Sequence, residues 1–118
     1  MIILIIYISV PARISTVINI KMKLINDEIK KVLPKLYEQD GKGLNAIAYI
    51  KFFTPDSNWS WYVTEFDGID TFFGLVDGFE KELGYFSLSE LQSVKGPLGL
   101  EIERDLYFKP TALKELMK

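Results

Sequence analysis

The fold is decided by residues 46–87, which read AIAYIKFFTPDSNWSWYVTEFDGIDTFFGLVDGFEKELGYFS. Runs rich in β-branched and aromatic residues alternate here with the turn signals Pro55-Asp56, Asp67-Gly68 and Asp77-Gly78. β-Branched and aromatic residues favour strands, and Asp-Gly pairs favour tight hairpin turns. The short spacing of the turns therefore predicts an antiparallel meander of three to four strands. The expected strands are 46–53, 59–66, 71–76 and 82–87.

Short helices are expected on both sides of this meander. Asn26 precedes two acidic residues and reads as a helix N-cap, while Ser87 and Glu90 have the spacing of a capping box. Pro110 stands just before a final apolar stretch, a position typical of helix starts. The expected helices are 27–33, 88–94 and 111–117, which makes the fold class α+β in a single domain.

Both faces of the predicted sheet are rich in apolar residues. Strict alternation places Trp59, Trp61 and Val63 on one face, and Tyr62 and Phe66 on the other. Either helices and loops cover both faces, or one aromatic face remains partly open.

The first 21 residues differ from the rest of the chain. Residues 1–10 read MIILIIYISV, which is too short an apolar run for a membrane span of about 20 residues. We interpret residues 1–21 as an N-terminal apolar extension or a mis-assigned start, and residues 22–118 as the α+β domain. The sequence contains no cysteine, which fits a cytoplasmic protein. Because the apolar run is too short to span a bilayer, no contact with a membrane is expected.

The absence of histidine and cysteine excludes several chemistries. Ser–His–Asp and Cys–His nucleophilic sites need one or both of these residues, and thiolate or imidazole metal sites need them too. The sequence contains no catalytic motif based on other side chains. We therefore expect a protein that is not an enzyme and that has no cofactor.

Acidic residues gather in the second half of the chain. The whole chain has a formal net charge of −2, yet residues 56–105 contain 11 acidic residues against Lys81, Lys95 and Arg104. Such a region repels phosphates and attracts basic partners, so a protein partner is favoured over a nucleic acid. The simpler interpretation is a solvated acidic face.

Three kinds of site were weighed against ordinary structural roles. Turn aspartates could bind a hard cation, but they usually bond backbone amides. Surface carboxylates could form an acid–base pair, but most are solvated. Aromatic residues could stack on single-stranded nucleic acid, but core packing is the better interpretation in an acidic region. The residues concerned are Asp67, Asp70 and Asp77 for the cation, Glu80, Glu82, Glu101 and Glu103 for the pair, and Phe52, Trp59, Trp61 and Tyr85 for stacking.

Several uninterrupted blocks resemble a known family. They are FFTPDSNWSWY (52–62), FGLVDGFEKELGYFSL (73–88), GPLGL (96–100) and ERDLYFKP (103–110). Together they resemble a bacterial family of short proteins of unknown function, typical of conjugative plasmids, integrative elements and phages. Residues 1–21 have no counterpart in that family, and the loop at 65–70 is shorter than in many members. The resemblance implies a biological setting and carries over no catalytic residue.

Two hypotheses about function follow. The first is a small accessory protein of a mobile genetic element that binds a protein through an acidic rim and an aromatic patch, one form of which is mimicry of DNA against a host factor. The second is a module that binds single-stranded nucleic acid on an aromatic sheet face. We favour the first. Its candidate interaction residues are Asp56, Trp59, Trp61, Asp67, Asp70, Asp77, Glu80 and Glu82.

Overall fold

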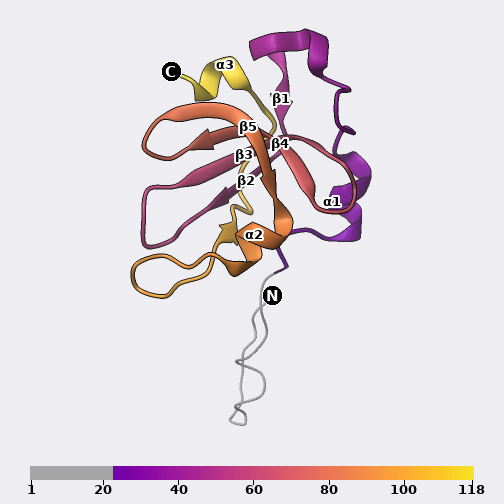
Figure 1. Cartoon of the computed structure of the whole chain (residues 1–118). Helices are drawn as coiled ribbons and strands as arrows, with labels where there is room; N and C mark the ends of the chain where they lie inside the picture. The colour runs from indigo at the N-terminus through magenta and orange to yellow at the C-terminus, as the bar shows by residue number, and fades with distance from the viewer. Residues whose placement is uncertain (1–22) are drawn as a thin grey trace.

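A five-stranded antiparallel sheet forms the centre of the computed structural model, which describes residues 23–118 (Figure 1). Its strand order is β5-β4-β3-β2-β6. The four longer strands follow one another along the chain and pair antiparallel, so the predicted meander is confirmed. The strands are β2 (Ile50–Phe53), β3 (Ser60–Phe66), β4 (Thr71–Asp77), β5 (Lys81–Ser87) and β6 (Glu103–Arg104).

The fifth strand exceeds the predicted number. β6 has only two residues, Glu103 and Arg104, which pair with Phe53 and Phe52 of β2. A two-residue strand is too short to show alternation in the sequence, so its pairing depends on contacts with a distant part of the chain. The Arg104 guanidinium also donates to the backbone carbonyls of Lys23 and Leu24, each at 2.8 Å. This edge of the sheet thereby holds the start of the described chain.

The first predicted strand is divided at Tyr49. β1 (Ile47–Ala48) leaves the main sheet and pairs antiparallel with β7 (Thr111–Ala112). The predicted helix 111–117 therefore starts as a strand, and only α3 (Leu113–Leu116) is helical. Tyr49 still donates its N–H to the Val63 carbonyl at 2.9 Å, so the chain bends without losing the ladder bond.

The two other predicted helices form with the expected caps. The Asn26 side chain accepts the Ile29 N–H at 2.8 Å at the start of α1 (Asp27–Val32). The Ser87 hydroxyl accepts the Glu90 N–H at 3.0 Å at the start of α2 (Leu88–Ser93). Between α1 and β1 the chain also forms a 3₁₀ helix, η2 (Asp40–Asn45).

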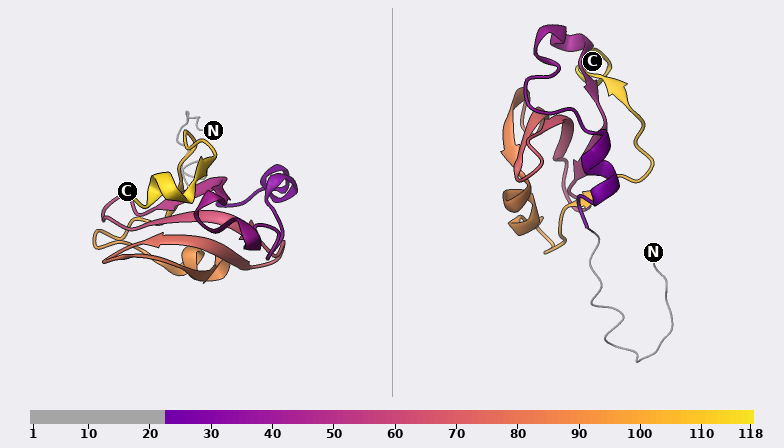
Figure 2. Two further views of the ribbon diagram at one scale, coloured as in Figure 1. Left: turned by 90° about the horizontal axis from the view of Figure 1, so that it is seen from above. Right: turned by 90° about the vertical axis from the view of Figure 1, so that its right-hand side faces the viewer.

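The core lies on both faces of the sheet, with α2 and α3 on opposite sides (Figure 2). The larger cluster packs the sheet against the segment 24–33, α2 and Ile102, and the smaller one lies beneath α3. The largest fully buried side chains of the larger cluster include Phe52 and Phe72. Helices and loops thus cover much of both faces of the sheet, which agrees with the first of the two alternatives expected from the sequence.

A β-bulge changes the predicted face of Phe66. The register between β3 and β4 shifts between Val63 and Glu65, so one extra residue enters β3. Phe66 therefore joins Val63 in the larger cluster, whereas strict alternation placed it on the face of Tyr62. Glu65 turns to the opposite face for the same reason. The expectations for residues 1–21 lie outside the described residues.

Candidate functional site

Three of the predicted interaction residues bond to the backbone of neighbouring loops. Asp56 accepts the Leu98 N–H at 2.7 Å and so ties the loop at 96–99 to the β2–β3 turn. Asp70 accepts the N–H and the hydroxyl of Ser89 at 2.8 and 3.0 Å, next to the start of α2. These two carboxylates thus have structural roles.

Asp67 is the third of these residues. One of its oxygens accepts the N–H groups of Ile69, Asp70 and Thr71 at 2.8, 2.8 and 3.0 Å. These bonds, that of Ile69 above all, lower the pKa of the Asp67 carboxyl. Asp67 therefore shapes the β3–β4 turn, as aspartates in such turns commonly do. Among residues 23–118 no group of three potential metal ligands is present.

Two of the aromatic residues considered for stacking belong to the core. Phe52 is fully buried and Trp61 is 8% exposed. They cannot present a ring face to a base while the sheet stays intact, so the core interpretation is confirmed for both. Trp59 is half-buried and packs on Trp61, with 5.9 Å between ring centroids.

The remaining predicted residues gather at the β4–β5 hairpin. Asp77 ends β4, Glu80 lies in the turn, Glu82 lies on β5, and Trp59 packs over Gly78 of the same turn. Trp59 also meets Phe79 edge-on, with 5.3 Å between ring centroids. Carboxylates and aromatic rings thus occupy one end of the sheet.

A cavity of about 270 Å³ lies at this hairpin, and we call it the hairpin groove. Phe79, at the turn, is 94% exposed. Tyr85 is 57% and Leu83 44% exposed, and alternation along β5 places their side chains on the face of Leu75, whereas Glu82 shares the face of Val76 and Trp59. A Cβ atom built on Gly84 would have nothing within 4 Å, so the strand is open to solvent at this point. The groove is lined by Trp59, Val76, Phe79, Glu80, Glu82, Leu83, Gly84 and Tyr85.

Sequence reasoning missed Phe79, Leu83 and Gly84. The position of Phe79 carried a usable signal, because it stands inside a turn between Gly78 and Glu80. An aromatic residue in a tight turn has little opportunity to reach the core. Its exposure could thus have been expected.

A buried polar network lies beneath the loop that contains Tyr37 and Gln39. Glu65 is 5% exposed, and its two carboxylate oxygens accept the N–H groups of Tyr37 and Gln39 at 2.9 and 2.7 Å. The Gln39 amide in turn bonds Ile47 N–H, Ile47 C=O and Thr64 C=O. Buried polar groups are stable only when bonded in this way. The network fastens the loop before η2 to the sheet.

Tyr37 connects that network to the groove. Its φ of 74° is in the left-handed region, which is uncommon for a residue other than glycine. Its hydroxyl bonds Tyr85, and this hydrogen bond raises the pKa of the Tyr85 hydroxyl. Tyr85, which belongs to the strand at the edge of the groove, thereby interacts with this loop.

We expect Glu65→Gln to lower the free energy of unfolding by about 2 kcal/mol. The variant has nearly the same shape, but its NH₂ group faces a buried N–H donor that has lost its acceptor. Urea unfolding followed by tryptophan fluorescence measures the change. Glu82→Gln is the matched control, because Glu82 is exposed, and exposed single charges usually alter stability by under about 0.5 kcal/mol. Equal effects of the two variants would contradict the structural role of Glu65.

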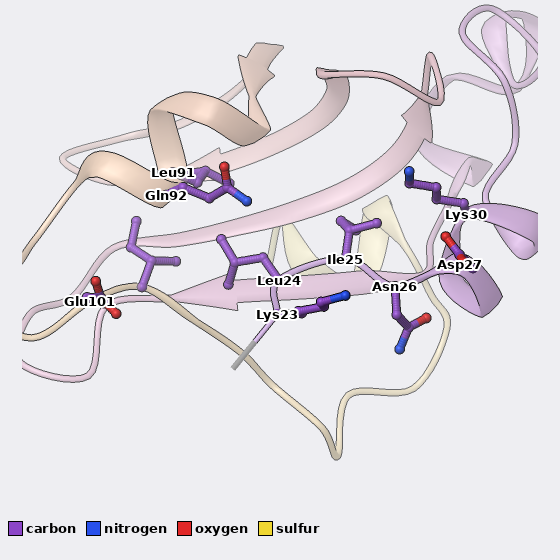
Figure 3. Close-up of a pocket in the computed structure, with 10 residues that line it drawn as sticks. Lys23, Leu24, Ile25, Asn26, Asp27, Lys30, Leu91, Gln92 and Glu101 are labelled. Atoms are coloured by element: carbon purple, nitrogen blue, oxygen red, sulfur yellow. The ribbon is translucent and has the colours of Figure 1, made fainter. Parts of the chain in front are cut away.

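A second cavity, of about 590 Å³, lies between the start of the described chain and α2 (Figure 3). Its apolar lining, Leu24, Ile25, Leu91 and Ile102, belongs to the core. Its rim mixes Lys23 and Lys30 with acidic side chains, so it offers no preference for one charge. The hairpin groove is the better candidate because its apolar side chains are exposed.

Of the carboxylates weighed as an acid–base pair, Glu80 and Glu82 lie together at the β4–β5 hairpin, whereas Glu103 lies on β6. Glu82 lies on β5 and Glu103 on β6, at opposite edges of the five-stranded sheet. A glycosidase pair needs its two carboxyl groups within about 10 Å of each other. Three strands separate these two, a distance of roughly 19 Å across the sheet.

The fold and the groove define a small α+β domain with an antiparallel sheet and an exposed aromatic hairpin. Residues 24–116 match the family described as a protein of unknown function, DUF2958, and the chain belongs to that family. The expected likeness to a family of unknown function is thus confirmed. Comparison with curated proteins and with solved structures gives no match. No helix among the described residues has the length and apolar character that crossing a membrane requires.

Proposed function

We propose that this protein is an interaction module that binds a basic segment of another protein in the hairpin groove. The observation that carries the proposal is the exposed ring of Phe79, packed edge-on against Trp59, beside the carboxylates of Glu80 and Glu82. Adjoining exposed apolar side chains with polar ones at the rim commonly mark binding sites.

The groove has the chemistry to hold lysine or arginine side chains. Their alkyl stems pack on apolar and aromatic surface while the charged ends reach carboxylates or aromatic faces. Lys81 does not oppose such a ligand, because its ammonium group donates to the carbonyls of Leu116 and Lys118 at 2.9 and 2.8 Å. The ammonium group of Lys81 is therefore already bonded to the end of the chain at α3.

The family resemblance suggests the setting. An accessory protein of a plasmid, integrative element or phage would work in the cytoplasm and would meet host proteins that handle DNA. Such proteins carry basic surfaces because they bind phosphates. Mimicry of DNA against one of them is a specific form of the proposal.

Charge reversal at the hairpin tests the proposal. Glu80→Lys together with Glu82→Lys is expected to weaken binding of a fluorescein-labelled peptide of alternating Lys and Val by at least about tenfold, since complementary charges are lost. Fluorescence anisotropy at low and high salt measures this loss, which should shrink as salt rises. Thermal melts should show that the variant stays folded.

The matched control moves the same charge elsewhere. Glu28→Lys with Glu103→Lys changes the net charge equally at two exposed positions outside the groove, and we expect less than about a threefold effect. If both double variants lose the same peptide affinity, the loss is due to net charge alone, and a binding site at the hairpin is contradicted. Tighter binding of an oligothymidine than of the peptide would favour the nucleic-acid hypothesis instead.

A further inference from the structure

We infer that the partner of the hairpin groove binds as an extended strand along the outer edge of β5. This inference rests on the proposed function and specifies how the partner is held. β5 is the long edge strand of the sheet: its seven residues pair with β4 on one side, and no described strand pairs with its other side. The opposite edge is the two-residue β6.

The backbone groups that face outward can be assigned from hydrogen bonds at the two ends of the β4–β5 ladder. The Leu88 N–H donates to the Asp70 carbonyl at 2.8 Å, and the Gly78 N–H donates to the Glu80 carbonyl at 3.1 Å. Even-numbered residues of this strand therefore turn their backbone groups toward β4. In an antiparallel strand the alternate residues turn theirs the other way, so Leu83 and Tyr85 present N–H and C=O groups to the outer edge.

The features that normally block an exposed edge are weak here. Natural proteins protect edges with charged side chains, proline, bulges or covering segments. From Leu83 to Ser87 the strand has neither charge nor proline, and β4 and β5 pair in unbroken register. Lys81, the cation of the strand, is bound to carbonyls near the C-terminus. An added strand would thus find free backbone groups beside the groove.

The charge of the region favours a basic strand over a second copy of this chain. Two copies paired through β5 would bring together two hairpins that each carry Asp77, Glu80 and Glu82, while Lys81 of each is bonded to carbonyls near the C-terminus. A basic strand would instead place its cations near Glu80 and Glu82 on one face of the sheet and its alternate apolar side chains beside Leu83 and Tyr85 on the other face. Strand addition obtains affinity from main-chain bonds and specificity from alternate side chains.

Leu83→Pro tests the edge directly. Proline removes one outward N–H and is tolerated on edge strands at such positions. We expect it to weaken binding of the Lys/Val peptide to the full chain by about tenfold. Leu83→Ala keeps the N–H and removes the side chain, so it separates the lost hydrogen bond from the lost apolar contact, and it should weaken binding less than the proline variant does. Amide hydrogen exchange of the wild-type chain should show protection of Leu83 and Tyr85 on adding the peptide, and this measurement stands even if the proline variant does not fold.

The outcomes separate the inference from the proposed function. Loss of binding in the Glu80/Glu82 reversal without protection of Leu83 and Tyr85 would overturn strand addition and leave the groove as the site. No detectable binding of the peptide would overturn both. A dimer of the wild-type chain that the proline variant abolishes, seen by light scattering, would overturn the basic partner in favour of a second copy.

Discussion

Replacing Phe72 with alanine is expected to lower the free energy of unfolding by about 3–5 kcal/mol, because a large buried ring is lost and a cavity remains. Phe72 is fully buried, and its ring centroid lies 4.5 Å from that of Phe66, 5.4 Å from that of Phe86 and 5.6 Å from that of Phe52. The side chain thus joins β2, β3, β4 and β5 at one point. Urea unfolding measures the change.

Phe79→Ala is the matched control for Phe72→Ala. The same ring is removed, but Phe79 is 94% exposed, so stability should change by less than about 0.5 kcal/mol. Peptide binding, by contrast, should weaken in the Phe79→Ala variant. A large loss of stability in Phe79→Ala would mean that the hairpin aromatics are part of the core, which would weaken the case for the groove.

Gly74→Ala is expected to lower the free energy of unfolding by about 3 kcal/mol, at the upper end of the usual cost of overpacking. A Cβ atom at this position would overlap the backbone carbonyl oxygen of Tyr62, where β3 bulges toward β4. A backbone group in a ladder cannot move aside as a flexible side chain would. The same unfolding experiment measures the effect.

Gly84→Ala is a control that lies directly across the ladder from Gly74. Its Cβ would meet open space, so this substitution should be close to neutral, since alanine also has less backbone freedom to lose on folding. If Gly74→Ala and Gly84→Ala lower the free energy of unfolding equally, any side chain at this pair of positions is destabilising. The assigned clash with the Tyr62 carbonyl is then wrong.

Local signals predicted the strands of the meander, its turns and the starts of α1 and α2 well. Asn26, Ser87 and Asp67 each bond an N–H within four residues, so their roles are already contained in short stretches of sequence. The hairpins follow for the same reason, because each turn joins strands that are neighbours along the chain. The candidate site was found only in part: Trp59, Asp77, Glu80 and Glu82 lie at one hairpin, whereas Trp61 is core and three aspartates hold loops.

The sequence by itself determined the antiparallel meander, the caps of α1 and α2 and the acidic character of the second half of the chain. Tertiary structure decided the face of Phe66 and Glu65, the pairing of β1 with β7, and the burial of Glu65 beneath the loop that contains Tyr37 and Gln39. It also decided that Phe79 and Gly84 border an open groove. The physical reason is that hydrogen bonds within a turn depend on nearby residues, whereas a bulge, a buried carboxylate and an uncovered strand edge depend on segments that meet only in the folded chain.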